Sequence, residues 1–99
     1  MLEDLTRDVL AENMNTTFRA QHEMLGTFNW DLIAVSELKS SPRQQAFSIL
    51  FRGPLDPIFG QGLYRLEHDR LGAFDLFIVP IGREPDGMRY EAVFNRLVK

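Results

Sequence analysis

Apolar and polar side chains alternate with a period of two along most of this chain, which is typical of half-buried β-strands. The alternation recurs in six segments, which are residues 16–23, 27–38, 45–52, 62–68, 73–81 and 88–95. The start of the chain differs, because residues 3–13 carry apolar side chains at helical spacing, with acidic residues in the first turn. The pattern predicts a mainly β protein with one short N-terminal helix, which would cap an open end of the strand structure.

Short loops that end at a glycine connect several of these segments. Gly26, Gly72 and Gly87 each close such a loop. A glycine adopts the left-handed conformation of a hairpin loop without steric cost, so these loops predict β-hairpins. A longer segment, residues 53–62, contains three glycines and two prolines and divides the chain into two halves.

Two stretches of the chain repeat each other. Residues 18–28 and 64–74 align with identical Arg, His, Leu, Gly and Phe. This repeat predicts two equivalent β-hairpins. We therefore expect two three-stranded meanders, over 16–52 and 62–95, that close on each other as a six-stranded antiparallel barrel or compact sandwich. The repeat reflects either a true duplication or similar hairpin chemistry at both turns.

Pro80 interrupts the longest apolar run, residues 76–81. Proline donates no backbone hydrogen bond, so it belongs at an edge, a bulge or a strand end. Pro80 therefore marks either a strand that bends late or an apolar edge that a partner covers.

Composition narrows the classes of function. The 99 residues carry a net charge of −3 and make one domain, residues 1–99. The basic residues are scattered singly, so we expect no nucleic-acid or anionic-membrane partner. The chain has no cysteine, its first residues are acidic, and its longest apolar run is too short to span a membrane. These features favour a cytoplasmic protein.

The chain has two histidines, His22 and His68, and each is followed by an acidic residue. Together with Glu67 and Tyr90 they could form a metal, acid–base or ligand-binding site. However, no H-x-H or H-x-x-x-H spacing is present. The favoured alternative is that each imidazole packs on its own hairpin and bonds a turn backbone group or the neighbouring acid.

The segment 53–62 carries apolar residues that either point inward or meet a partner. These residues are Leu55, Ile58 and Phe59, and with Pro80 they form the candidate interaction surface. The segment lacks the phosphate-binding signature G-x-x-x-x-G-K-[ST], and no serine lies in G-x-S-x-G. We therefore expect no catalytic residue, metal site or cofactor.

The C-terminal half carries two distinctive motifs, F-R-G-P at residues 51–54 and Y-E-A-V-F-N at residues 90–95. With these motifs the chain resembles an uncharacterised family of small bacterial domains, each about as long as this chain. The resemblance implies no assigned activity. It also implies an occurrence near phage-tail-like proteins, and hence an assembly or accessory role.

Two functions remain open. The first is a non-enzymatic protein-interaction or assembly module, an accessory of a phage-tail-like system, that binds a protein partner or itself through an edge strand or the segment 53–62. The alternative is a small-ligand-binding barrel or minor enzyme that uses His22 and His68.

Overall fold

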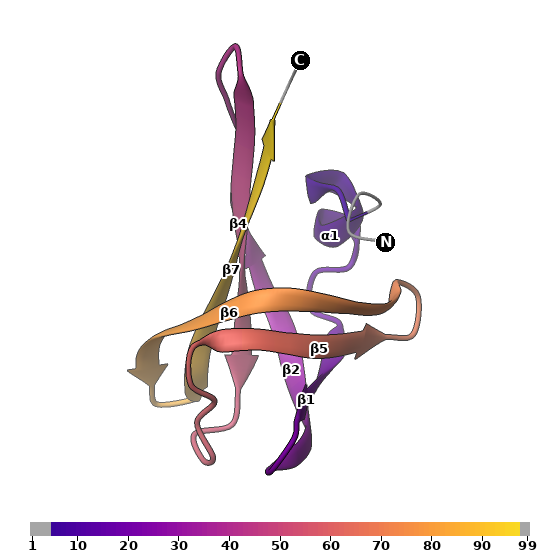
Figure 1. Ribbon diagram of the computed structural model, residues 1–99. Coiled ribbons are helices and arrows are strands. Elements are labelled where there is room, and N and C mark those ends of the chain that lie inside the picture. Colours follow the sequence, from indigo (N-terminus) through magenta and orange to yellow (C-terminus); the bar gives the residue numbers. More distant parts are fainter. Residues whose placement is uncertain (1–4, 98–99) are drawn as a thin grey trace.

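The computed structural model describes residues 5–97, which form one short helix and seven strands (Figure 1). The helix α1 spans Arg7–Glu12, and the strands are β1 (Thr17–His22), β2 (Gly26–Val35), β3 (Lys39–Ser40), β4 (Gln44–Gly53), β5 (Gly62–His68), β6 (Gly72–Glu84) and β7 (Gly87–Leu97).

The N-terminal helix is shorter than the predicted range 3–13, whose first two residues lie outside the described part. The Oγ1 atom of Thr6 accepts a hydrogen bond from the N–H of Val9, so Thr6 is the N-cap and α1 begins at Arg7. Asn13 ends the helix. The predicted range is therefore too long at its start, because capping and not apolar spacing sets where the helix begins.

The strands form a closed antiparallel barrel in the order β1-β2-β4-β7-β6-β5, with β5 returning to β1. Each half of the chain supplies a three-stranded meander: β1, β2 and β4 from the first, and β5, β6 and β7 from the second. The mainly β class and the barrel are confirmed. The very short strand β3, which pairs with the outer edge of β4, was not predicted.

The repeat in the sequence coincides with a repeat in the pairing of strands. Ala20 and Leu66 occupy matching positions of the two repeats, and they are direct partners across the β1–β5 pair. The second strand of each meander also shifts register against the third, between Leu32 and Ala34 in β2 and between Pro80 and Gly82 in β6. Pro80 thus lies at a bulge, one of the places that its missing N–H predicts.

The core fills the barrel with large side chains. Trp30 and Tyr90 are both fully buried, and their rings stack with centroids 4.1 Å apart. Gly53 passes close over Trp30, because a Cβ atom at this position would lie 2.7 Å from the indole Nε1. The aromatic enrichment of the sequence is therefore used mainly inside the barrel.

The β4–β7 pair extends past the barrel as a projecting arm, which we define as residues 39–48 and 92–97. In the arm Phe47 stacks on Phe94 with ring centroids 4.7 Å apart. The pairing of β7 with β6 covers only the part from Gly87 to Glu91, whereas its pairing with β4 continues to Leu97. Figure 1 shows β7 rising with β4 while β6 runs across the barrel. From Ala92 onward, β7 therefore has one edge that pairs with no other described strand.

Candidate functional site

The side chain of His22 holds its own hairpin turn together. Its Nδ1 atom accepts hydrogen bonds from the backbone N–H groups of Met24 and Leu25, both at 3.1 Å. The imidazole ring also stacks on Tyr64, with centroids 5.8 Å apart. His22 thus bonds the backbone of its own turn, as the favoured interpretation of the sequence predicted.

His68 has the same role in the second repeat. Its Nδ1 atom accepts from the N–H groups of Arg70 and Leu71 at 3.0 and 3.3 Å. Its Nε2 atom lies 2.9 Å from the hydroxyl of Thr16, which itself donates to the carbonyl of Asn13. The neutral ring with its proton on Nε2 satisfies every one of these bonds. Burial lowers the pKa of His68, in keeping with a neutral ring.

The two histidines lie at opposite ends of the β1–β5 pair. His68 packs on Phe18 and His22 packs on Tyr64, and each of these pairs joins β1 to β5. Phe18 and His22 are four residues apart in β1, which corresponds to about 13 Å along a strand. The structure therefore does not bring the histidines together into one site.

The other two residues of the proposed polar site have separate structural contacts. Glu67 accepts a hydrogen bond from Gln21 across the β1–β5 pair. The hydroxyl of Tyr90 accepts a bond of 2.8 Å from the N–H of Phe59, and burial raises its pKa. Both contacts stabilise the barrel and leave no shared centre with His68.

The residues of the candidate interaction surface differ in their exposure to solvent. Phe59 is buried, with 1% exposure, and packs against Trp30 and Tyr64 with centroids 5.0 Å from each. Phe59 is thus a core residue and its place on the interaction surface was wrong. Ile58 is exposed, while Leu55 and Pro80 are partly buried.

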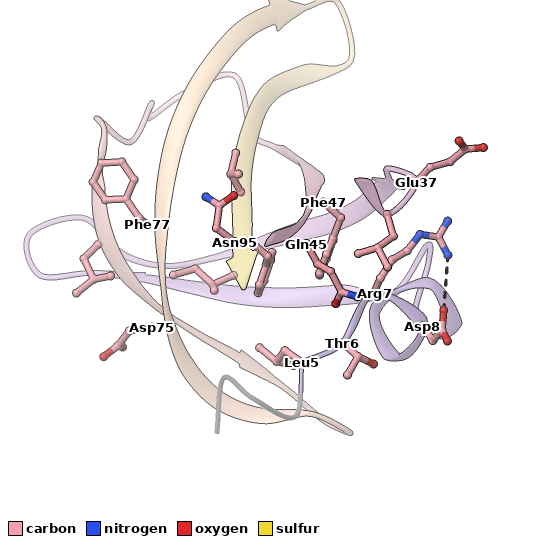
Figure 2. Close-up of a pocket in the computed structure, with 15 residues that line it drawn as sticks. Leu5, Thr6, Arg7, Asp8, Glu37, Gln45, Phe47, Asp75, Phe77 and Asn95 are labelled. Atoms are coloured by element: carbon pink, nitrogen blue, oxygen red, sulfur yellow. Dashed lines mark ion pairs between the residues drawn. The ribbon is translucent and has the colours of Figure 1, made fainter. Parts of the chain in front are cut away.

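A groove of about 820 Å³ lies outside the barrel, where β6 and β7 diverge (Figure 2). One wall comes from β5 and β6, the other from the arm, and the start of α1 with the residues before β3 forms one end. Its apolar lining consists of Leu5, Leu38, Phe47, Leu63, Leu76, Phe77, Val93 and Phe94.

The groove is open to solvent. Leu63, Phe77 and Val93 keep 67%, 53% and 57% of their surface exposed. Leu5 and Leu76 in the same lining are buried, with 6% exposure each, so the groove has a buried floor and an exposed apolar margin. Contiguous exposed apolar surfaces are typical of sites that contact another protein, a membrane or a ligand.

The charged groups around the groove are mainly acidic. Asp8, Glu37 and Asp75 carry the carboxylates, and Arg7 is the single basic residue in the lining. The guanidinium of Arg7 lies 3.7 Å from Asp8 and its Nε–H donates to the carbonyl of Ser36. Asp75 lies 3.4 Å from the guanidinium of Arg65 on β5, so neighbouring basic side chains balance most of this negative charge.

Sequence reasoning missed this groove, because it depends on how far β7 runs beyond β6. One signal was present in the alternation pattern. Leu63 and Val93 are apolar at exposed positions of β5 and β7, whereas Leu66 and Ala92, at positions of the opposite parity in the same strands, are buried. Apolar residues on the outer face of several strands indicate a covered or contact surface.

A second polar cluster lies at the far end of β4. Arg52 lies 2.9 Å from Asp31 and 3.5 Å from Asp86, and Arg89 also bonds Asp86. The hydrogen bond that Arg52 donates to Asp31 raises the pKa of Arg52, and the one that Arg89 donates to Asp86 lowers the pKa of Asp86. These charges balance one another around the β6–β7 turn, so the cluster is a structural network.

Neither a metal site nor a membrane-spanning helix was found in the described part of the chain. Within residues 5–97, no three His, Asp or Glu side chains are grouped so that they could hold a metal ion. The helix in that range is too short and too polar to cross a membrane.

Comparison with known proteins agrees with the resemblance noted in the sequence. No curated protein and no solved structure matches the chain. A family model described as "Domain of unknown function (DUF6916)" matches residues 5–94, which include the barrel, α1 and most of the arm. The chain therefore belongs to this family of domains of unknown function.

Proposed function

We propose that this domain is a non-enzymatic protein-interaction or assembly module that binds its partner through the groove. The observation that carries the proposal is an open apolar groove beside a strand edge that pairs with no other described strand. Such an edge presents backbone N–H and C=O groups that can add a strand from a partner, and apolar side chains next to it supply contact area.

The positions of the two histidines favour this class over the ligand-binding or enzymatic alternative. His22 and His68 each bond their own turn and lie at opposite ends of β1 and β5. The Nδ1 atom of each histidine and the Nε2 atom of His68 are therefore engaged in structural contacts. An accessory role in a phage-tail-like particle is the setting that the family resemblance suggests, and it requires a protein contact surface of this kind.

Capture of binding partners from the cells that make this protein tests the proposal. The immobilised domain is compared with a Phe77→Glu variant, which places a charge in the groove, and with a Met24→Lys variant. Met24 is the matched control, because it is 87% exposed and lies at the β1–β2 turn, outside the lining of the groove. Partners that Phe77→Glu loses and Met24→Lys keeps would support the proposal, and partners retained equally by both would contradict it.

A further inference from the structure

His68 is a buried titratable residue at a point where separate segments of the chain meet. It is the last residue of β5 and is 5% exposed. Its Nδ1 atom bonds the turn between β5 and β6, and its Nε2 atom lies against Thr16, which connects α1 to β1. We infer that His68 is a proton-sensitive latch, which joins this turn to the connection between α1 and β1 while its ring is neutral and releases it when the ring takes up a proton. The inference is independent of the proposed function.

The hydrogen bonds around the ring fix the position of its one proton. The hydroxyl of Thr16 has a single hydrogen, which it donates to the carbonyl of Asn13 at 2.6 Å. The oxygen of Thr16 therefore accepts from the Nε2–H of His68, at 2.9 Å. Nδ1 carries no hydrogen, because it accepts from the N–H groups of Arg70 and Leu71. Both nitrogens of the neutral ring are thus fully used.

A second proton has no place in this arrangement. It would bind to Nδ1, and the new N–H would then point at the two backbone N–H groups of the turn. The charged ring would also be held out of water against the buried ring of Phe18, whose centroid lies 4.4 Å away. The protonated ring therefore leaves its position, which breaks the bond to Thr16 and uncovers one side of Phe18.

The surroundings of the ring keep the latch closed at neutral pH. Burial is the main cause that lowers the pKa of His68 below its ordinary value. Arg19 on β1 and Arg70 in the turn lower it further. Asp69 raises it, but this carboxylate is exposed and lies 3.0 Å from the guanidinium of Arg19. Glu12, which ends α1, is exposed to solvent.

His22 provides a comparison within the same molecule. It occupies the equivalent position of the first repeat, and its Nδ1 atom bonds the N–H groups of its own turn in the same way. Its ring is partly exposed, so it can reach water without opening the barrel. The bond from Nε2 to a preceding segment and the deep burial are what distinguish His68, and they make it the latch.

A pH titration of the intact domain by NMR tests the inference. Nuclear Overhauser effects from the ring of His68 to Phe18 and Thr16 should be present at pH 7.5 and disappear as the ring takes up its proton. Those between the stacked rings of Trp30 and Tyr90 should persist, because the barrel stays closed. The nitrogen chemical shifts of the imidazole give both the pH of proton uptake and the position of the proton before it.

Three results of this titration would overturn the inference. The first is a ring that takes up its proton and keeps its contacts with Phe18 and Thr16. The second is a loss of these contacts that occurs together with the separation of Trp30 from Tyr90, because the event is then unfolding of the whole barrel. The third is a neutral ring with its proton on Nδ1 at pH 7.5.

Variants separate the latch from other titrating groups. His68→Asn keeps an oxygen that can accept from the turn but does not titrate, so the amide signals of Arg70 and Leu71 should lose the pH dependence that follows His68. His22→Asn is the matched control and should leave this dependence as it is. Equal dependence in His68→Asn and in the unchanged chain would overturn the inference.

Thr16→Val tests the latch without changing a histidine, and it keeps the inference testable if His68→Asn does not fold. The valine has nearly the same shape as threonine but lacks the oxygen that accepts from Nε2. The closed neutral ring then loses one hydrogen bond, so the latch should open at a pH that is higher by up to about one unit. Opening at an unchanged pH would contradict the role of Thr16 and overturn the inference.

Discussion

Replacing Phe59 by alanine should destabilise the whole barrel, although the residue lies in an irregular segment. Its ring is 1% exposed and is surrounded by aromatic rings at centroid distances from 5.0 to 6.1 Å. A buried Phe→Ala change costs about 3–5 kcal/mol, which includes the cavity that it leaves. A domain of this size is stable by about 5–15 kcal/mol, so the variant should lose roughly a fifth or more of the free energy of unfolding.

Urea unfolding measures this loss directly. The single tryptophan of the chain, Trp30, lies 5.0 Å from Phe59 between ring centroids, so its fluorescence reports on this region. With a slope of about 2 kcal/mol per molar urea, the midpoint should fall by about 2 M. The N–H of Phe59 remains in the alanine variant, so its bond to Tyr90 is retained and the measurement isolates the ring.

The neighbouring residue is the control for this experiment. Ile58 is 44% exposed, and we expect Ile58→Ala to change the free energy of unfolding by less than about 1 kcal/mol. A cost below about 1 kcal/mol for Phe59→Ala, or equal costs for the two variants, would refute the conclusion that the ring completes the core.

Two further predictions concern His68 and Gly53. Burial lowers the pKa of His68 below its ordinary value of 6.5, so the unfolded chain binds this proton more readily, and stability should fall as the pH decreases from 6.5 through the lowered pKa. His68→Asn should reduce the difference in urea midpoint between pH 7.5 and pH 5, and an equal difference in both proteins would contradict the assignment. Gly53→Ala should cost about 1–3 kcal/mol in thermal unfolding, because its Cβ would lie 2.7 Å from Trp30 Nε1. Gly60→Ala, with no atom within 4 Å of the added Cβ, is the control, and equal effects would count against the clash.

Local patterns were sufficient to predict the six barrel strands and their grouping into two meanders, but not the order in which the meanders pair. Hairpin turns depend on a few adjacent residues, and the glycines at 26, 72 and 87 all take positive φ angles. The repeat then implied equivalent hairpins, and the pairing of Ala20 with Leu66 shows them related in the barrel. The interpretation that each histidine bonds its own turn succeeded for the same reason. The Nδ1 atom of each imidazole bonds N–H groups that are just two and three residues further along the chain.

Features that depend on distant segments were less predictable. The direction of Phe59 depends on the rings of β2, β5 and β7, which the local sequence does not place. The start of α1 depends on which residue caps it, and Thr6 does so. The groove depends on the lengths over which β7 pairs with β6 and with β4, and no property of one strand alone reveals such a difference.

A comparison of the two halves explains why the proposed contact surface, the groove, lies beside β7 and has no counterpart beside β4. Each meander bends at a bulge in its second strand, so that this strand pairs first with one neighbour and then with the other. In the first half, β4 ends at Gly53, and the segment that follows folds back to bury Phe59 against the barrel. In the second half, β7 continues to Leu97 and leaves its edge open beside exposed Phe77 and Val93. The first half buries Phe59 within the chain, whereas the second half leaves Phe77 and Val93 exposed, which is why we propose the contact surface on that side.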